Sequence, residues 1–173
     1  HKNSWYKRNE HFIAEISDLE LEILKNISYY SMSTPANHWA IIQSIKHIKE
    51  NSIKGDLVEC GVWRGGNLIL FKKLIDQHKL DKKIFAFDTF EGMPEPTIND
   101  YDLKDIKAQQ IYDNYKTKDI KWCYSTLEEV KKNIFKFYPD YDESFKFIEG
   151  KVETTLKNSK NLPDQISLLR LDT

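Results

Sequence analysis

The stretch GDLVECGVWRGGN, residues 55–67, joins a short apolar run to an acid and a glycine-rich turn. The apolar residues predict a buried strand with Glu59 at its carboxyl end. The turn that follows contains Gly61, Gly65 and Gly66. Because glycine has no side chain, the backbone there can approach a ligand closely, as at the sites where α/β sheets bind nucleotide-like ligands. Asn67 is predicted to cap the helix after the turn.

The glycine spacing differs from the G-x-G-x-x-G pattern of dinucleotide-binding proteins. Trp63 stands where a pyrophosphate would need bare backbone. The acid precedes the first glycine, in the order Glu59-x-Gly61. This order resembles motif I of class I S-adenosylmethionine methyltransferases, E/D-x-G-x-G-x-G, although Trp63 replaces its middle glycine.

Three further segments have the composition of strands: IFAFD at 84–88, SFKFIEG at 144–150 and ISLLRLD at 166–172. Apolar spacing predicts helices in residues 10–30 and 38–50, and a short helix that begins at Glu153. A capping box at Ser125 and Glu128 predicts another helix, which ends near residue 137. Residues 97–120 are interpreted as a polar excursion over the sheet edge.

Strands that alternate with helices predict an α/β fold with a doubly wound, mostly parallel sheet. We expect an N-terminal helical cap over residues 1–50 and a Rossmann-like domain over residues 51–173.

Acids at the strand ends form the candidate site, because ligands of parallel sheets bind at the carboxyl ends of the strands. Asp88 offers two acceptor oxygens to a ribose diol, or caps its own loop. Glu59 accepts from the ammonium group of a methionyl ligand, or ties down N–H groups in the turn. Asp172 holds a divalent metal or takes a proton from an acceptor hydroxyl, or is a structural acid at a strand end.

The loop after the third strand contains Gly150 and Lys151. An adenine ring is expected to stack near this loop, with backbone N–H groups reading its edge. The Lys151 side chain itself is expected to lie in solvent.

The composition argues against several classes of protein. The chain has 173 residues, with 26 lysines and arginines, 27 acids and a net charge of −1. This balance gives no electrostatic basis for binding nucleic acid or an anionic membrane. Its apolar runs are far shorter than the roughly 20 residues of a membrane span. Two cysteines, Cys60 and Cys123, lack metal-type spacing and favour a reduced, cytoplasmic protein.

Four blocks of the sequence resemble one family, the macrocin O-methyltransferases (TylF-like). The blocks are GDLVECGVWRGGN, AFDTFEGMPEP at 86–96, FIEGKVETTL at 147–156 and LLRLDT at 168–173. Trp63 is usual in this family's motif I, and Thr89 replaces a usual serine. Members of the family are bacterial enzymes that methylate sugar hydroxyls with S-adenosylmethionine and a divalent metal, usually magnesium.

The resemblance implies a class I methyltransferase fold and a role for each matching residue. S-adenosylmethionine would be bound along the glycine turn and by the residues at the strand ends. These are Glu59, Gly61, Gly65, Gly66, Asp88, Thr89, Phe90, Gly150 and Lys151. Asp172 would be the first ligand of Mg²⁺ and a candidate base. The acceptor would be a hydroxyl of a sugar or glycosylated metabolite, and the resemblance suggests a homodimer.

The family pattern continues beyond the point where this sequence stops, at Thr173. A class I sheet normally has seven strands and four are predicted here, so we expect the cofactor half of the fold without its C-terminal strands. Two other functions stay open. One is a non-catalytic domain that binds S-adenosylmethionine or supports assembly. The other is a nicotinamide-dependent oxidoreductase, against which Trp63 and the missing G-x-G-x-x-G pattern argue.

Overall fold

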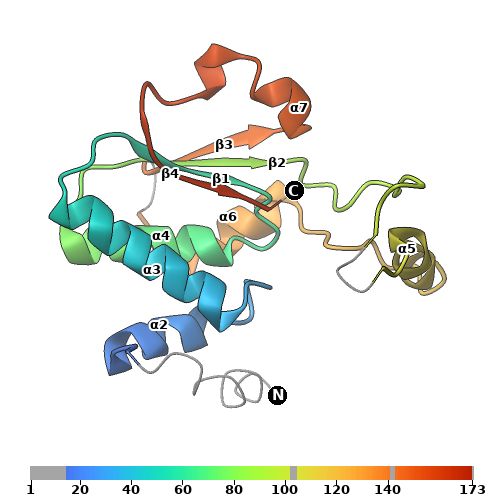
Figure 1. Ribbon diagram of the computed structural model, residues 1–173, viewed down its shortest axis with the longest axis horizontal. Helices are drawn as coiled ribbons and strands as arrows, with labels where there is room; N and C mark the ends of the chain where they lie inside the picture. Colours follow the sequence, from blue (N-terminus) through green and yellow to red (C-terminus); the bar gives the residue numbers. More distant parts are fainter. Residues whose placement is uncertain (1–14, 102–104, 141–142, 173) are drawn as a thin grey trace.

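The computed structural model describes residues 15–101, 105–140 and 143–172 (Figure 1). Four strands form one sheet in the order β3-β2-β1-β4. Their bounds are β1 (Asp56–Cys60), β2 (Ile84–Asp88), β3 (Phe145–Glu149) and β4 (Ile166–Leu171). Every neighbouring pair is parallel. The four predicted strands and the parallel sheet are therefore confirmed.

Helices lie on both faces of the sheet. Figure 1 shows α2 (Asp18–Ile27), α3 (Pro35–Glu50), α4 (Gly66–His78) and α6 (Leu127–Phe135) on one side. On the opposite side the connection from β3 to β4 carries α7 (Val152–Thr155) and the short 3₁₀ helix η2 (Ser159–Asn161). Connections on both faces make the sheet doubly wound, as predicted.

Two apolar clusters match these two faces. The larger one lies on the side of α3 and α4 and includes Leu57 of β1. The smaller one lies against α7 and contains Val58, Cys60, Phe85 and Phe87. Successive side chains of a strand point to opposite faces, so a strand covered on both sides is mostly apolar.

Of the two N-terminal helices, α3 packs on α4 and β4, and α2 packs on α4. Ser17 and Glu20 form a capping box at the start of α2. α3 begins at Pro35, about one turn earlier than predicted, because Thr34 caps it and proline suits the first helical position. Apolar residues of α2 and α3 belong to the larger cluster. The predicted division at residue 50 stays a prediction, and residues 1–14 of the expected cap, with the start of the helical segment predicted over 10–30, lie outside the described residues.

Two predicted helix caps are wrong by one or two residues. α4 is capped by Gly65, which has a left-handed backbone (φ +83°), and Asn67 lies inside the helix with its side chain buried. α6 is capped by Thr126, whose hydroxyl accepts a hydrogen bond from the Glu129 N–H.

One α-helix of the described residues was not predicted. α5 (Ala108–Lys116) lies within the expected excursion, and none of its residues is buried. Figure 1 shows it well away from the sheet, beyond the end of β2. Among the described helices, none is long and apolar enough to cross a membrane.

Candidate functional site

The turn between β1 and α4 is held by the carboxylate of Asp88, the last residue of β2. Its Oδ2 accepts hydrogen bonds from the N–H groups of Val62 (2.6 Å) and Trp63 (3.2 Å). Its Oδ1 accepts from the N–H of Phe90 at 2.8 Å. A carboxylate has about four acceptor positions, so it can hold these loops and still receive a hydroxyl. Its role toward a ribose stays a prediction.

Trp63 adopts a left-handed backbone in this turn, with φ +48°. A residue with a Cβ rarely takes this conformation, which explains why a glycine suits the same place in other motif I sequences. The Arg64 guanidinium lies 5.1 Å from the ring centre of Tyr29 and 5.2 Å from that of Trp63. The Arg64 cation therefore packs against both aromatic rings.

The protein's own backbone occupies the space that the glycines leave free. A Cβ on Gly66 would lie 2.6 Å from backbone atoms of Tyr30, whose carbonyl accepts the Gly66 N–H at 2.8 Å. A Cβ on Gly61 would overlap the carbonyl oxygen of Asp172. These two glycines thus let the segment before α3 and the end of β4 approach the turn, and Gly65 supplies the left-handed cap of α4.

Glu59 is fully buried within β1 and takes part in a polar network. Its Oε1 accepts from Asn67 Nδ2 and from Arg170 Nη1, each at 2.9 Å. Its Oε2 has no hydrogen-bond partner among the described residues. Burial raises the pKa of Glu59 to about 7, against the lowering effects of Arg170 and Asn67. The free oxygen fits a bound donor such as an ammonium group.

The network continues into the segment between α2 and α3. Asn67 Nδ2 donates to Ser33 Oγ at 3.1 Å, and Ser31 Oγ donates to Asn67 Oδ1 at 3.2 Å. The fully buried His38 has its Nε2 3.0 Å from Ser31 Oγ. Burial, together with the charge of Arg170, lowers the pKa of His38 to about 4. His38 is therefore neutral near pH 7.

Asp172 follows β4 and faces the surface. Its side chain is 62% exposed, and its Oδ2 accepts from Arg170 Nη2 at 2.8 Å. Among the described residues, no group of three His, Cys, Asp or Glu side chains is arranged to hold a metal ion. Mg²⁺ requires near-octahedral oxygen coordination, so Asp172 alone does not make the predicted magnesium site.

The other predicted residues lie near the ends of β2 and β3. Thr89 accepts the Glu91 N–H and donates weakly to the Gly92 carbonyl. Phe90 is buried in the larger apolar cluster, so it serves the core there. Gly150 donates its N–H to the Asp88 carbonyl at 2.9 Å. Lys151 caps α7 through its backbone and is exposed, as expected.

The structure therefore brings Glu59, the glycine turn, Asp88 and Asp172 to one edge of the sheet. Sequence reasoning missed Arg170, which links Glu59 to Asp172, and Ser33, which accepts from Arg170 and Asn67. The spacing of Arg170 and Asp172, two apart at the end of one strand, placed them on the same face. The pairing of Arg170 with Glu59 depends on strand order and register, which the sequence does not display.

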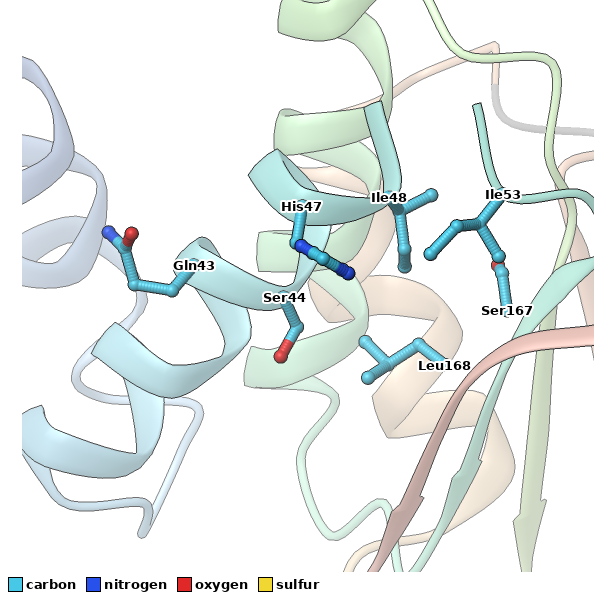
Figure 2. Close-up of a pocket in the computed structure, with 7 residues that line it drawn as sticks. All are labelled: Gln43, Ser44, His47, Ile48, Ile53, Ser167 and Leu168. Carbon is cyan, nitrogen blue, oxygen red and sulfur yellow. The ribbon is translucent and has the colours of Figure 1, made fainter. Parts of the chain in front are cut away.

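A separate groove lies near the start of β4. It has a volume of about 380 Å³ and lies between α3 and β4. Figure 2 shows His47 and Ile48 of α3 opposite Leu168 of β4. None of the strand-end acids lines it, so this groove is distinct from the candidate site.

Comparison with known proteins gives concordant matches. The macrocin-O-methyltransferase (TylF) family matches residues 28–173. The chain is 32% identical over 133 residues to demethyldecarbamoylnovobiocin O-methyltransferase of Streptomyces niveus, covering 76% of this chain and 47% of the relative. It is 26% identical over 129 residues to 8-demethyl-8-(2,3-dimethoxy-alpha-L-rhamnosyl)-tetracenomycin-C 4'-O-methyltransferase of Streptomyces olivaceus, covering 74% and 46%. The chain thus spans about half the length of these relatives.

A solved structure agrees with these sequence matches. The O-methyltransferase NovP superposes with a TM-score of 0.65 at 27% identity, over 83% of this chain and 55% of that one. The likeness confirms the predicted Rossmann-like class I methyltransferase fold. Since the family match extends from residue 28 through every strand that contributes to the site, the chain belongs to the macrocin-O-methyltransferase (TylF) family.

Proposed function

We propose that the protein transfers a methyl group from S-adenosylmethionine to a hydroxyl of a sugar or glycosylated metabolite. The observation that carries the proposal is the meeting of Glu59, Asp88 and Asp172 around the glycine turn in a chain of this family. Two relatives named above are O-methyltransferases, and the name of one includes a rhamnosyl group. A nicotinamide-dependent oxidoreductase loses its support, because the relatives are methyltransferases.

Each strand-end residue has a separate task in this proposal. The free Oε2 of Glu59 accepts from the ammonium group of the cofactor, directly or through water. Asp88 accepts from the ribose while it holds the turn. The loop at Gly150 lies beside the adenine. S-adenosylmethionine supplies a methyl group on a positively charged sulfur.

Asp172 acts on the acceptor. The acceptor oxygen forms a bond to the methyl carbon, the carbon–sulfur bond breaks, and its electron pair goes to sulfur. The proton of the hydroxyl goes to the exposed carboxylate of Asp172. Holding the acceptor in line with the methyl group supplies the orientation that this displacement requires.

Metal assistance is a finer part of the proposal, with Asp172 as one ligand. The described residues supply no further ligands, so the steps above use none. Adding Mg²⁺ or a chelator to the full-length protein during turnover tests this part directly. Turnover that is equal in both conditions would contradict it.

The acceptor class is tested with full-length protein, S-adenosylmethionine and a panel of acceptors. The panel contains demethyldecarbamoylnovobiocin, simple L-rhamnosides and the same aglycones without sugar. We expect formation of S-adenosylhomocysteine only with the glycosylated acceptors. If S-adenosylhomocysteine forms with none of these acceptors, the proposal is overturned. Binding of S-adenosylmethionine without turnover would then favour the non-catalytic alternative.

Cofactor recognition is tested by calorimetry with Asp88→Asn. Because Asp88 also holds the turn, affinity for S-adenosylhomocysteine alone does not isolate the ribose contact. The informative quantity is the loss of affinity caused by removing a ribose hydroxyl from the ligand. We expect this loss to be about tenfold in the wild type, as for a hydrogen bond to a charged group, and small in Asp88→Asn. An equal loss in both proteins would place the ribose elsewhere.

A further inference from the structure

We propose that Arg170 is a positioning residue, which holds the Asp172 carboxylate in its orientation for methyl transfer by anchoring it to Glu59 and Ser33. The inference rests on the proposed function, in which Asp172 faces the acceptor. It gives a role to Arg170, a residue of the LLRLDT block to which the sequence analysis assigned none.

The guanidinium of Arg170 makes three hydrogen bonds to three parts of the chain. Nη1 donates to Glu59 Oε1 on β1 at 2.9 Å. Nη2 donates to Ser33 Oγ, before α3, at 3.0 Å and to Asp172 Oδ2 at 2.8 Å. Arg170 lies directly opposite Glu59 in the register of β1 and β4. Residues two apart on a strand share a face, which brings Asp172 to the same guanidinium.

Burial makes this arrangement asymmetric. The Glu59 side chain is 0% exposed and that of Arg170 is 14% exposed, whereas that of Asp172 is 62% exposed. The buried end is therefore fixed by packing, and the exposed carboxylate is the part that needs an anchor. A planar guanidinium with its donors in a rigid fork transmits orientation from one end to the other.

Asn67 holds the two side chains to which Arg170 is anchored. Asn67 of α4 donates to both Glu59 Oε1 and Ser33 Oγ, the two other acceptors of Arg170. Hydrogen bonds therefore hold four side chains together, and the Asp172 carboxylate is attached to this group through Arg170. The four are Glu59, Ser33, Asn67 and Arg170. A displaced carboxylate would lose the alignment on which transfer depends, and an error of about 1 Å can cost about 100-fold in rate.

A lysine at position 170 separates positioning from charge. Its ammonium is compact, and it can neutralise Glu59 without bridging three acceptors. In Arg170→Lys we therefore expect binding of S-adenosylhomocysteine to stay within about threefold of the wild type. With any acceptor that the wild type methylates, including demethyldecarbamoylnovobiocin, kcat falls at least tenfold and KM for S-adenosylmethionine changes little.

The decisive measurement is a double-mutant cycle in the full-length protein. If Arg170 acts through Asp172, the Arg170→Lys substitution lowers kcat when Asp172 is present. The same substitution changes kcat little further in a protein that already carries Asp172→Asn. Additive losses would overturn the inference. Lys72→Arg exchanges the same two kinds of side chain in an ion pair with Asp76 on α4, without any bond to Glu59 or Asp172, and we expect kcat near that of the wild type.

A second cycle needs no acceptor. Urea unfolding of the wild type, Arg170→Lys, Asp172→Asn and the double variant measures whether the two side chains interact. We expect non-additive stabilities, and strictly additive ones would overturn the inference. If the wild type turns over an acceptor and Arg170→Lys has the same kcat, the positioning role is refuted and the proposed function stands. Absence of turnover with the whole panel refutes the proposed function, and the unfolding cycle then still decides whether Arg170 holds Asp172.

Discussion

At the scale of single residues, the turn between β1 and α4 depends on glycines for two different reasons. Gly65 needs its left-handed backbone, whereas Gly66 is helical and needs the absence of a Cβ against Tyr30. Gly55 is equally restricted, because it has φ +101° and a Cβ there would lie 2.6 Å from backbone atoms of Gln165. A substitution at Gly55 is therefore unsuitable as a neutral control for the turn.

We predict that Gly66→Ala destabilises the protein by about 1–3 kcal/mol, the usual range for forcing extra atoms into a packed site. Gly65→Asn is expected to cost less than Gly65→Ala, since asparagine tolerates a left-handed backbone better. Urea unfolding of the three variants measures both effects. Gly66→Ala with the stability of the wild type would mean that the segment at Tyr30 does not rest on the helix.

His38 and Glu59 predict opposite dependences of stability on pH. The folded pKa of His38, about 4, lies below its ordinary 6.5, so the unfolded chain binds more protons and this contribution is lost as the pH falls from 6.5 to 4. The folded pKa of Glu59, about 7, lies above its ordinary 4.5, so its contribution is lost as the pH rises from 4.5 to 7. The two slopes oppose each other over most of this range.

Substituting one of the two residues should reveal the pH dependence of stability that the other one causes. Between pH 4.5 and 6.5 we expect the unfolding free energy of His38→Gln to fall with rising pH, and that of Glu59→Gln to rise. The wild type should vary least of the three. His47→Gln, at an exposed position on the same helix, is the control. Parallel profiles for all the variants would contradict the prediction.

The candidate site was predictable from the sequence only as far as strand ends could be located. Glu59, Asp88 and Asp172 each follow an apolar run, and a parallel sheet places such ends at one edge. The partner of Glu59 was not predictable, because Arg170 is 111 residues away and meets it only through strand order. The buried role of Asn67 was missed because the same residue type is a good helix cap.

At the scale of elements, local patterns predicted the strands better than the helix ends. β2 is a continuous apolar run between turn residues, which is the pattern of a strand buried on two faces, and the other strands are short apolar-rich runs with similar boundaries. α5 escaped prediction because it has no buried residue, and therefore no apolar face that packs on the sheet. Helix ends shifted by one residue where two capping residues, Ser125 and Thr126, are adjacent.

The cap of α6 gives a direct test at this scale. Thr126 Oγ1 accepts the Glu129 N–H at 3.1 Å, whereas Ser125 Oγ donates to the Glu129 carboxylate at 3.0 Å. We expect Thr126→Ala to cost about 1 kcal/mol and Ser125→Ala to cost less. Urea unfolding measures the stability lost in each variant. A larger loss in Ser125→Ala than in Thr126→Ala would mean that Ser125, the cap predicted from the sequence, is the correct one.

At the scale of the whole molecule, β4 forms one edge of the described sheet. Leu169 and Leu171 are 49% and 64% exposed, on the face that the α7 connection covers elsewhere. An apolar strand with unpaired backbone groups is a template for pairing with another chain. The homodimer suggested by the family resemblance stays a prediction.

We predict that the 173-residue polypeptide self-associates on its own through β4. Leu169→Lys should shift sedimentation toward the monomer, because a charge opposes pairing at an exposed strand. Leu19→Lys, at a residue of α2 that is 56% exposed, is the matched control and should leave association unchanged. Equal sedimentation of both variants and the wild type would exclude β4 as the contact.

The position of β1 between β2 and β4 also sets the order in which the protein can fold during its synthesis. Arg170 leaves the ribosome 111 residues after Glu59, which corresponds to roughly 6–22 s at about 5–20 residues per second. During that interval first β2 and then β3 is made and can join the sheet on one side of β1, while the other edge of β1 stays open and the Glu59 carboxylate lacks its guanidinium. The sheet therefore closes from the β3 side toward β4, and the nascent chain is most exposed to aggregation and chaperone binding just before β4 is made.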